Sequence, residues 1–451
     1  MMLFLKKYKN LGFNLFGVGV LFLPSAPFIG GLFFIFSLIF SFLNEKVEIK
    51  KDRKDYLFII ASIIMIGTSL IHFINFENIN YILERWNDVI KQNRYSIITR
   101  NSYSSLVGLL NWIPLFICFF GFQPFLKSSK DRKIILKLFL IGSIPVLISG
   151  AGQLMLNWHS PVELFNGLII WYQKPSTTFS GLFNNQNYAG CWLNIICPFG
   201  LAIFHEKSKN IFKKTTSFIL IISIFLASFL TLSRNTWGGL FLSIPLVLGP
   251  ITIYWVILFF ILAIIPIFLK SVNFLPENIS NLLNSLLPIK FNIFEMVIDQ
   301  FSSDSYPNQA NARITIFGVA LKLISEKPFI GWGAAAFPIY YGFKKGIFIS
   351  HTHNLFIDTA FNYGIVTAIC IFSNILFICF ASFKKIYLKK ITNSSENYFE
   401  RAWWTSFFVL LCSQMFDVQY YDGRISIAFW ILLAGLKCII FEDDENMTCT
   451  T

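Results

Sequence analysis

Charged residues are scarce in this sequence. Only 14% of its 451 residues are charged, whereas 55% are hydrophobic and 53 are phenylalanines. A typical soluble domain has about 25% charged residues, and apolar runs of membrane-spanning length recur along this chain. The composition therefore excludes an ordinary soluble globular protein and predicts a polytopic membrane protein.

Paired cysteines and a cleavable leader are also missing. The eight cysteines lie almost all within apolar segments and have no spacing typical of a zinc site or a disulfide framework. The first apolar run is followed by LPSAP (23–27) rather than by a small-residue cleavage site, so it is interpreted as an uncleaved span. The net charge of +13 does not indicate nucleic-acid binding, because the basic residues cluster between apolar runs.

About twelve apolar segments alternate with polar ones, which predicts an all-α protein with about twelve transmembrane helices. Several are shorter than the roughly 20 residues that a straight span needs. The pairs around Pro24 and around Gly249-Pro250 could each be one broken span. The segments are 11–23, 28–43, 56–74, 103–125, 134–149, 187–204, 216–232, 236–249, 251–269, 355–383, 402–416 and 424–441.

Every second loop is basic, and this alternation predicts the orientation. Basic residues in short loops mark the cytoplasmic side, so both termini are expected in the cytoplasm. The clearest basic clusters are KVEIKKDRK (46–54), KSSKDRKIILK (127–137) and KSKNIFKK (207–214).

This orientation divides the chain into three parts. Residues 1–269 are expected to form spans one to nine, and residues 270–354 one large periplasmic loop with amphipathic helices. Residues 355–451 are expected to form spans ten to twelve and a short cytoplasmic tail. Segment 75–102 has apolar and charged residues at helical spacing, which predicts a helix along the membrane interface.

Ionisable residues are nearly absent from the predicted span centres and stand instead at the outer ends of spans. A coupled transporter more often has its charges and broken helices near the bilayer midplane. The pattern here indicates chemistry or binding at the outer face. The residues concerned are Arg234, Asp358, Asp417 and Arg424.

Arg234 and Arg313 are candidate anion-binding residues. Arg234 stands among Ser233, Asn235 and Thr236, although an arginine at a helix end can also simply extend to water. Arg313 is expected in the first turn of a helix, where the macrodipole favours anions rather than cations. An anion between the guanidinium and the helix end would explain this position, and a solvated surface arginine is the alternative.

The helix that carries Arg313 has recognisable boundaries. Asn308 or Asn311 can cap it, and the glycine- and proline-rich sequence from Pro328 onward ends it. Its apolar stripe is expected to be Ile314, Phe317, Leu321 and Ile324.

Two histidines precede the tenth predicted span. A neutral imidazole is a workable general base near pH 7, and Asn354 or Asp358 could orient the ring. Metal ligation by His351 and His353 is not indicated, because no cysteine or second carboxylate stands close in sequence. A polar helix cap at the interface is the alternative.

A run of amides opens the sixth predicted span. Asn185 and Asn187 belong to FSGLFNNQNYAG (179–190), which is too polar for contact with lipid tails. These amides are expected to line a cavity or to bind sugar hydroxyls, unless they form an ordinary polar loop.

Four segments in this order resemble the O-antigen ligase/polymerase superfamily of bacterial membrane glycosyltransferases. The resemblance covers roughly residues 175–380, and its motifs are specific in their order and side of the membrane rather than individually. The segments are FSGLFNNQNYAG, TLSRNTWGG (231–239), NARITIFGVALKLISEKPFIGWGAAAF (311–337) and HTHNLFIDTAFNYGI (351–365).

The resemblance implies a GT-C-like helical fold in the bacterial inner membrane. It implies transfer of a glycan from a polyprenyl-pyrophosphate donor to a hydroxyl of a lipid or glycan acceptor, without metal, cofactor or nucleic acid. Arg234 and Arg313 would hold the pyrophosphate and His353 would be the base, with His351 an additional histidine that could take its place. Asn185, Asn187, Asn354 and Asp358 complete the expected substrate-binding set.

Two other functions fit the sequence less well. One is a transporter of a small anion such as bicarbonate, or of a lipid-linked glycan, which would need charges near the midplane. The other is a non-catalytic scaffold in envelope assembly, in which Arg313 and His353 would be dispensable. Neither ligase nor polymerase activity is favoured by the residues themselves.

Overall fold

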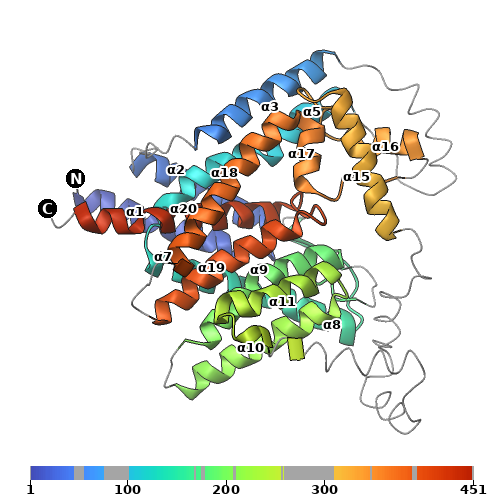
Figure 1. Ribbon diagram of the computed structural model, residues 1–451. Helices are drawn as coiled ribbons and strands as arrows, with labels where there is room; N and C mark the ends of the chain where they lie inside the picture. The colour runs from blue at the N-terminus through green and yellow to red at the C-terminus, as the bar shows by residue number, and fades with distance from the viewer. Residues whose placement is uncertain are drawn as a thin grey trace, which may run out of the picture.

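The computed structural model describes residues 2–44, 55–75, 101–166, 169–173, 178–206, 210–254, 257–258, 309–345, 348–388 and 394–448. Most of the predicted interfacial helix at 75–102, most of span 251–269 and the first part of the predicted loop 270–354 lie outside these residues. The helices form one bundle, with α1 beginning and α20 ending at the same end of it (Figure 1).

Among the described residues, seven helical segments are long and apolar enough to cross a membrane. This result confirms a mostly helical polytopic membrane protein, while the count of about twelve spans stays a prediction. The seven segments are α3 (Tyr56–Ile74); Ser104–Phe125 with α5 (Ser104–Gly108), η1 (Leu109–Asn111), α6 (Ile113–Phe122) and η2 (Gln123–Phe125); Ser129–Met155 with α7 (Ser129–Gly142) and α8 (Ile144–Met155); α9 (Gln186–Phe204); α10 (Ile211–Leu230); Ile365–Leu388 with α18 (Ile365–Phe383) and η3 (Lys384–Leu388); and the first part of α20 (Gly423–Thr448).

The remaining helices are shorter or less apolar than these seven segments. They are α1 (Met2–Phe22), α2 (Pro27–Asn44), α11 (Arg234–Leu248), α15 (Gln309–Glu326), α16 (Phe337–Lys345), α17 (Leu355–Tyr363) and α19 (Ser394–Ser413). The first two pack against each other as a hairpin, with Gly19 next to Phe34 and Gly12 next to Phe40. The break near Pro24 therefore separates two helices.

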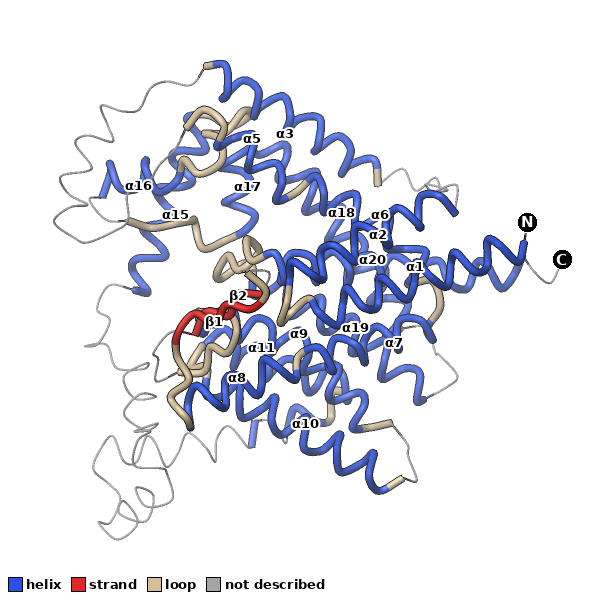
Figure 2. Tube along the Cα trace, turned by 180° about the vertical axis from the view of Figure 1, so that it is seen from behind, coloured by secondary structure: helices blue, strands red, loops and turns tan. Residues whose placement is uncertain are grey.

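A small β-hairpin departs from the all-α expectation. Strands β1 (Ser160–Leu164) and β2 (Ile169–Gln173) pair antiparallel, with Val162 opposite Trp171. The Trp171 indole N–H donates to the carbonyl of Ser25 at 2.7 Å, which ties the hairpin to the turn between α1 and α2. Figure 2 shows the hairpin at the same end of the bundle as α15 and α17.

The predicted tenth span, 355–383, is two helices rather than one. Gly364 has φ of 90° and separates α17 from α18. A β-carbon at Gly364 would clash with the carbonyl oxygen of Phe329, and the backbone N–H of Ile365 donates to the carbonyl of Pro328 at 2.8 Å. The break thus gives the segment after α15 a place to dock, and only glycine tolerates it readily.

The helix that carries Arg313 exists, but the predicted stripe is partly wrong. Ile314 and Leu321 are 72% and 55% exposed, whereas Ile316, Ala320 and Leu323 are buried. Most positions of α15 are apolar, so periodicity alone does not choose between two faces. The face with the small Ala320 packs on Phe337 of α16 and Phe361 of α17.

Close packing of small residues brings α9 and α11 together. A β-carbon at Gly239 of α11 would clash with the Asn194 side chain of α9, and Asn194 Nδ2 donates to the carbonyl of Asn235 at 3.4 Å. Small residues commonly allow such approach between membrane helices. The contact holds the N-terminal half of α11, which begins at Arg234, against α9.

Ion pairs stabilise the end of the bundle opposite to α15 and α17. Arg132 of α7 is 2% exposed and contacts Glu400 at 2.6 Å and Glu442 at 2.5 Å. Lys437 contacts Asp55 at 3.0 Å, also buried. Charges removed from water need such partners, so these pairs hold α7, α19 and α20 and the start of α3 in register.

Candidate functional site

A strained turn sets the position of His353. Its φ of 57° lies in the left-handed region, which is uncommon for residues other than glycine and concentrates at functional sites. The next residue, Asn354, caps α17 by accepting from the backbone N–H of Ile357 at 3.0 Å. The Asn354 amide also donates to the carbonyl of Met415 at 3.0 Å, so this amide anchors the turn to the loop between α19 and α20.

His353 contacts a carboxylate that is distant in sequence. Its Nδ1 lies 2.9 Å from Asp417 Oδ1, and the two side chains are 25% and 14% exposed. Burial would raise the pKa of Asp417, but the hydrogen bond with His353 and the nearby charges of His353, His351 and Arg313 together lower it. An ionised Asp417 accepts a hydrogen bond from Nδ1–H of His353, which leaves Nε2 of His353 as the free basic nitrogen.

His351 lies beside this pair. Its ring centroid is 4.5 Å from that of His353, and its Nδ1 accepts from the backbone N–H of His353 at 3.2 Å. Its Nε2 lies 3.9 Å from Asp417 Oδ1. Burial, and secondly the neighbouring His353, lower the pKa of His351, so this ring is held neutral.

These three side chains offer ligand atoms within 4.8 Å of one another. A neutral His351 that accepts at Nδ1 carries its proton on Nε2, the atom that faces Asp417. Coordination through Nε2 would therefore require the loss of the hydrogen bond at Nδ1. The arrangement fits a hydrogen-bonded base better than a metal centre.

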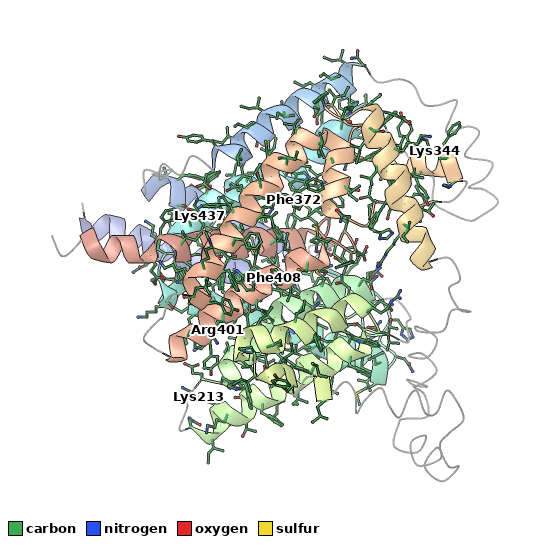
Figure 3. All side chains as sticks on the ribbon, viewed as in Figure 1. Lys213, Lys344, Phe372, Arg401, Phe408 and Lys437 are labelled. Atoms are coloured by element: carbon green, nitrogen blue, oxygen red, sulfur yellow. The ribbon has the colours of Figure 1, made fainter. Side chains whose placement is uncertain are left out.

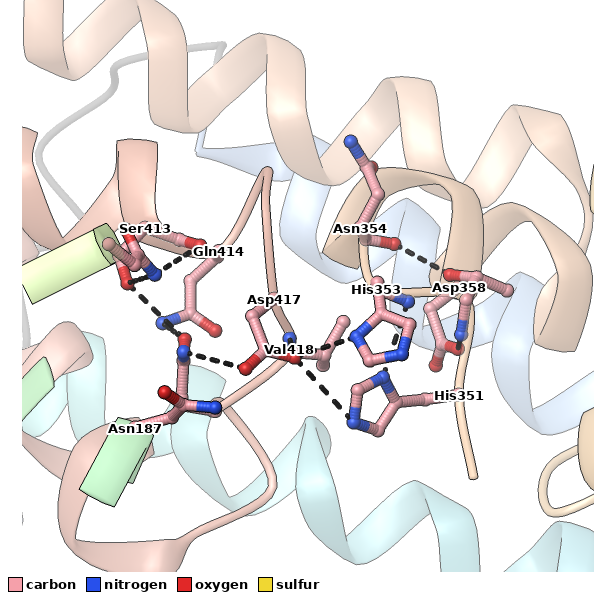
Figure 4. A network of polar contacts seen from close by, with 12 residues as sticks. Asn187, His351, His353, Asn354, Asp358, Ser413, Gln414, Asp417 and Val418 are labelled. Carbon is pink, nitrogen blue, oxygen red and sulfur yellow. Dashed lines mark hydrogen bonds and ion pairs between the residues drawn. The ribbon is translucent and has the colours of Figure 1, made fainter. Parts of the chain in front are cut away.

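Asp358 is committed to other partners. It is 3% exposed, and its carboxylate accepts from the Thr352 backbone at 3.2 Å, from Asn362 at 3.0 Å and from the Tyr421 hydroxyl. The carboxylate that contacts His353 is therefore Asp417. Figure 4 shows the two imidazoles between Asp417 on one side and Asp358 on the other.

A chain of hydrogen bonds connects Asp417 to the start of α11. Gln419 donates to Asp417 Oδ2 at 3.1 Å, and its side-chain oxygen accepts from Ser413 at 3.3 Å. The Asn235 amide donates to the Ser413 hydroxyl at 2.7 Å. Asn235 directly follows Arg234, so the network links this exposed arginine to the loop that orients His353.

Arg313 reaches the same region from α15. α15 begins at Gln309, so Arg313 lies just past the first turn in which the sequence predicted it. Its side chain is exposed, and its positive charge helps to lower the pKa of Asp417. Arg234, Arg313 and His353 therefore lie at the same end of the bundle. Figure 3 shows Lys344 at this end, whereas Lys213, Arg401 and Lys437 lie toward the opposite end.

The two asparagines of the sixth predicted span lie at the start of α9. The Asn185 side chain caps the helix by accepting from the backbone N–H of Asn187 at 2.7 Å. Asn187 is half-buried, and Figure 4 places it beside the loop that carries Asp417. Asn185 therefore has a structural contact, and Asn187 is the better placed of the two for a ligand.

Sequence reasoning missed Asp417 and Gln419 as site residues. The signal that could have found Asp417 was already present, since it is one of few carboxylates at the predicted outer ends of spans. It stands 64 residues beyond His353, and the two come together because the loop after α19 binds the start of α17 through the bonds from Asn354 to Met415 and from Leu355 to Gln414.

Comparison with known proteins identifies a segment that contains these motifs. Residues 218–372 match the family model described as O-Antigen ligase. The match includes Arg234, Arg313, His351 and His353, while Asp417 lies beyond it. No curated protein matches the chain. The family match confirms the resemblance to the O-antigen ligase/polymerase superfamily and supports a membrane enzyme of that type.

Proposed function

We propose that this protein is an inverting, metal-independent glycosyltransferase of the O-antigen ligase or polymerase type. It moves a glycan from a polyprenyl-pyrophosphate donor to a hydroxyl of a lipid or glycan acceptor at the periplasmic face of the inner membrane. The observation that carries the proposal is the 2.9 Å contact between His353 and Asp417, with the charge of Arg313 acting on the same carboxylate.

His353 acts as the general base. Asp417 accepts a hydrogen bond from Nδ1–H of His353. Nε2 of His353 removes the proton from the acceptor hydroxyl as that oxygen attacks the anomeric carbon. Asp417 then stabilises the imidazolium that forms. A positioned base of this kind contributes about 10²–10⁴-fold to the rate.

Arg234 and Arg313 act on the leaving group. As the acceptor oxygen bonds to the anomeric carbon, the bond from that carbon to the pyrophosphate oxygen breaks and its electron pair remains on the pyrophosphate. Two guanidinium groups can neutralise this charge without a metal ion. The beginning of α11, at Arg234, adds backbone N–H groups that favour an anion.

The test is rescue of a gene deletion, scored on a gel of surface polysaccharide. Wild type and His205→Ala, a histidine at the C-terminal end of α9, should restore the wild-type pattern. Arg234→Ala, Arg313→Ala, His353→Ala and Asp417→Asn should not, although all are present in the membrane at wild-type level.

The pattern in the deleted strain separates the two acceptors. A ladder reduced to single repeats indicates a polymerase, and accumulated full-length lipid-linked polymer indicates a ligase. Rescue by all four site variants would reject catalysis at this site and leave a transporter or a scaffold.

A further inference from the structure

A cavity adjoins His351. It has a volume of about 450 Å³ and lies between the start of α5, the turn before α16 and the first turn of α17. Its walls include Asn101, Tyr103, Ser104, Asn111, His351 and Tyr421. A volume of a few hundred cubic ångströms is typical of small-ligand sites.

The wall of this cavity suits a neutral polyhydroxylated ligand. Among the described residues that line it there is no lysine or arginine, so a pyrophosphate would find no compensating charge there. The Asp358 carboxylate also lines it, but accepts from Thr352, Asn362 and Tyr421.

Amides, hydroxyls and aromatic rings remain available to a ligand in this cavity. The Tyr103 ring is 58% exposed and packs on Phe73 at 5.2 Å between centroids. Within the described part of the chain, no hydrogen bond involves the side chain of Asn111, whose backbone carbonyl accepts from Tyr420. An aromatic face beside amide groups matches the C–H face and the hydroxyl rim of a sugar ring.

The histidine pair adjoins both this cavity and the charged groups around Asp417. His351 belongs to the cavity wall, and its ring lies 4.5 Å from His353. Beyond His353 lie Asp417 and the charge of Arg313. Figure 4 shows both imidazoles next to Asp417, with Asp358, a residue of the cavity wall, on the opposite side of His353.

We propose that this cavity is the acceptor subsite and binds the acceptor sugar beside His351, which lines it, while the reacting hydroxyl extends to His353, whose ring centroid lies 4.5 Å from that of His351. The proposal rests on the proposed function. In a displacement with inversion, the attacking and leaving oxygens lie on opposite sides of the anomeric carbon. The arginines therefore define the donor side, and the uncharged cavity beside the histidine pair receives the acceptor, so that the acceptor hydroxyl faces both the base and the anomeric carbon.

The first experiment measures binding without turnover, with purified full-length protein in detergent. One probe is the phosphate-free glycan released by mild acid from the acceptor that accumulates in the deletion strain, and the other is polyprenyl pyrophosphate without sugar. Tyr103→Ala and Asn111→Ala should weaken glycan binding about tenfold each, the effect of one lost hydrogen bond or stacking contact. They should leave polyprenyl pyrophosphate binding unchanged.

Matched variants complete the binding test. Arg313→Ala should have the opposite selectivity, weakening only polyprenyl pyrophosphate binding. Tyr254→Ala, at a tyrosine that is 74% exposed beyond the C-terminal end of α11, should change neither. Unchanged glycan binding in Tyr103→Ala and Asn111→Ala, or a loss of pyrophosphate binding in either, would overturn the assignment.

A transfer assay with the same proteins separates this proposal from the proposed function. Both cavity variants should raise KM for the acceptor about tenfold and leave kcat and the donor KM unchanged. If wild type transfers glycan and the variants change only the donor KM, the acceptor subsite is refuted while the enzyme stands. If wild type transfers nothing under any condition, the proposed function fails and the acceptor role fails with it.

Discussion

Replacing Asp417 by asparagine tests the catalytic role of the carboxylate with little change of shape. The amide keeps one oxygen, which at the Oδ1 position can still accept from the backbone N–H of Val418, 3.0 Å away. Its NH2 group takes the place of Oδ2 and cannot accept from Gln419, which donates to that oxygen at 3.1 Å. What it removes is the negative charge opposite Nδ1 of His353. The His353 imidazolium then forms without a charged partner.

The expected loss of rate follows from the interaction between the Asp417 charge and the His353 imidazolium. A hydrogen bond to a charged group contributes about 1.5–3 kcal/mol, and each 1.36 kcal/mol of barrier is tenfold in rate, so kcat should fall about 10–150-fold. The side chains are at most one-quarter exposed, so screening by water reduces the effect only modestly. KM for donor and acceptor should stay within about threefold, since neither substrate contacts Asp417 directly in the proposed arrangement.

The assay is steady-state transfer by purified protein, with thermal unfolding in the same detergent as a control for folding. A kcat within threefold of wild type, at unchanged stability, would refute the role of Asp417 in orienting and charging His353. A loss confined to the donor KM would place the carboxylate in donor binding instead.

Three further predictions concern stability and can be measured by thermal unfolding. The folded-state pKa of His351 is lowered below 6.5, so the unfolded chain binds the proton more tightly and stability should fall as the pH drops below about 6.5. His351→Gln should make stability depend less on pH in this range. An unchanged pH dependence in this variant would contradict the neutral, buried ring. Arg132→Met leaves Glu400 buried without its partner and should cost about 3–5 kcal/mol, whereas unchanged stability would show that the pair is dispensable. Gly364→Ala forces a β-carbon against the Phe329 carbonyl at positive φ and should lower the free energy of unfolding by about 1–3 kcal/mol. Gly318→Ala, with open space around it, should be neutral or stabilising. Equal effects of the two substitutions would contradict the docking described for Gly364.

The site was more predictable than the details of its scaffold. The motif at His353 and Asn354 and the two arginines were recognisable because ionisable residues in an apolar chain are few and their order is informative. The family match confirms that resemblance. The contact between His353 and Asp417 was not predictable from spacing, because it depends on how the loop between α19 and α20 docks on the start of α17.

The errors in the scaffold have physical causes. In α15, apolar residues cover more than one face, so hydrophobic periodicity did not distinguish the exposed Ile314 from the buried Ile316. The β-hairpin had a signal that was overlooked: β-branched and aromatic residues of β1 and β2 stand on either side of Asn166-Gly167, a pair typical of tight hairpin turns. The break at Gly364 was hidden in a continuous apolar run, since its requirement comes from the approach of Phe329, a distant segment.

The most direct test of the central claim is transfer by the purified full-length protein, measured as release of free polyprenyl pyrophosphate and formation of glycosylated acceptor in the same reaction. Wild type and His205→Ala should release one pyrophosphate carrier per glycan transferred, without added metal. His353→Ala should reduce both signals together by about 10²-fold or more. Equal rates for His353→Ala and wild type, with the protein folded, would contradict the account.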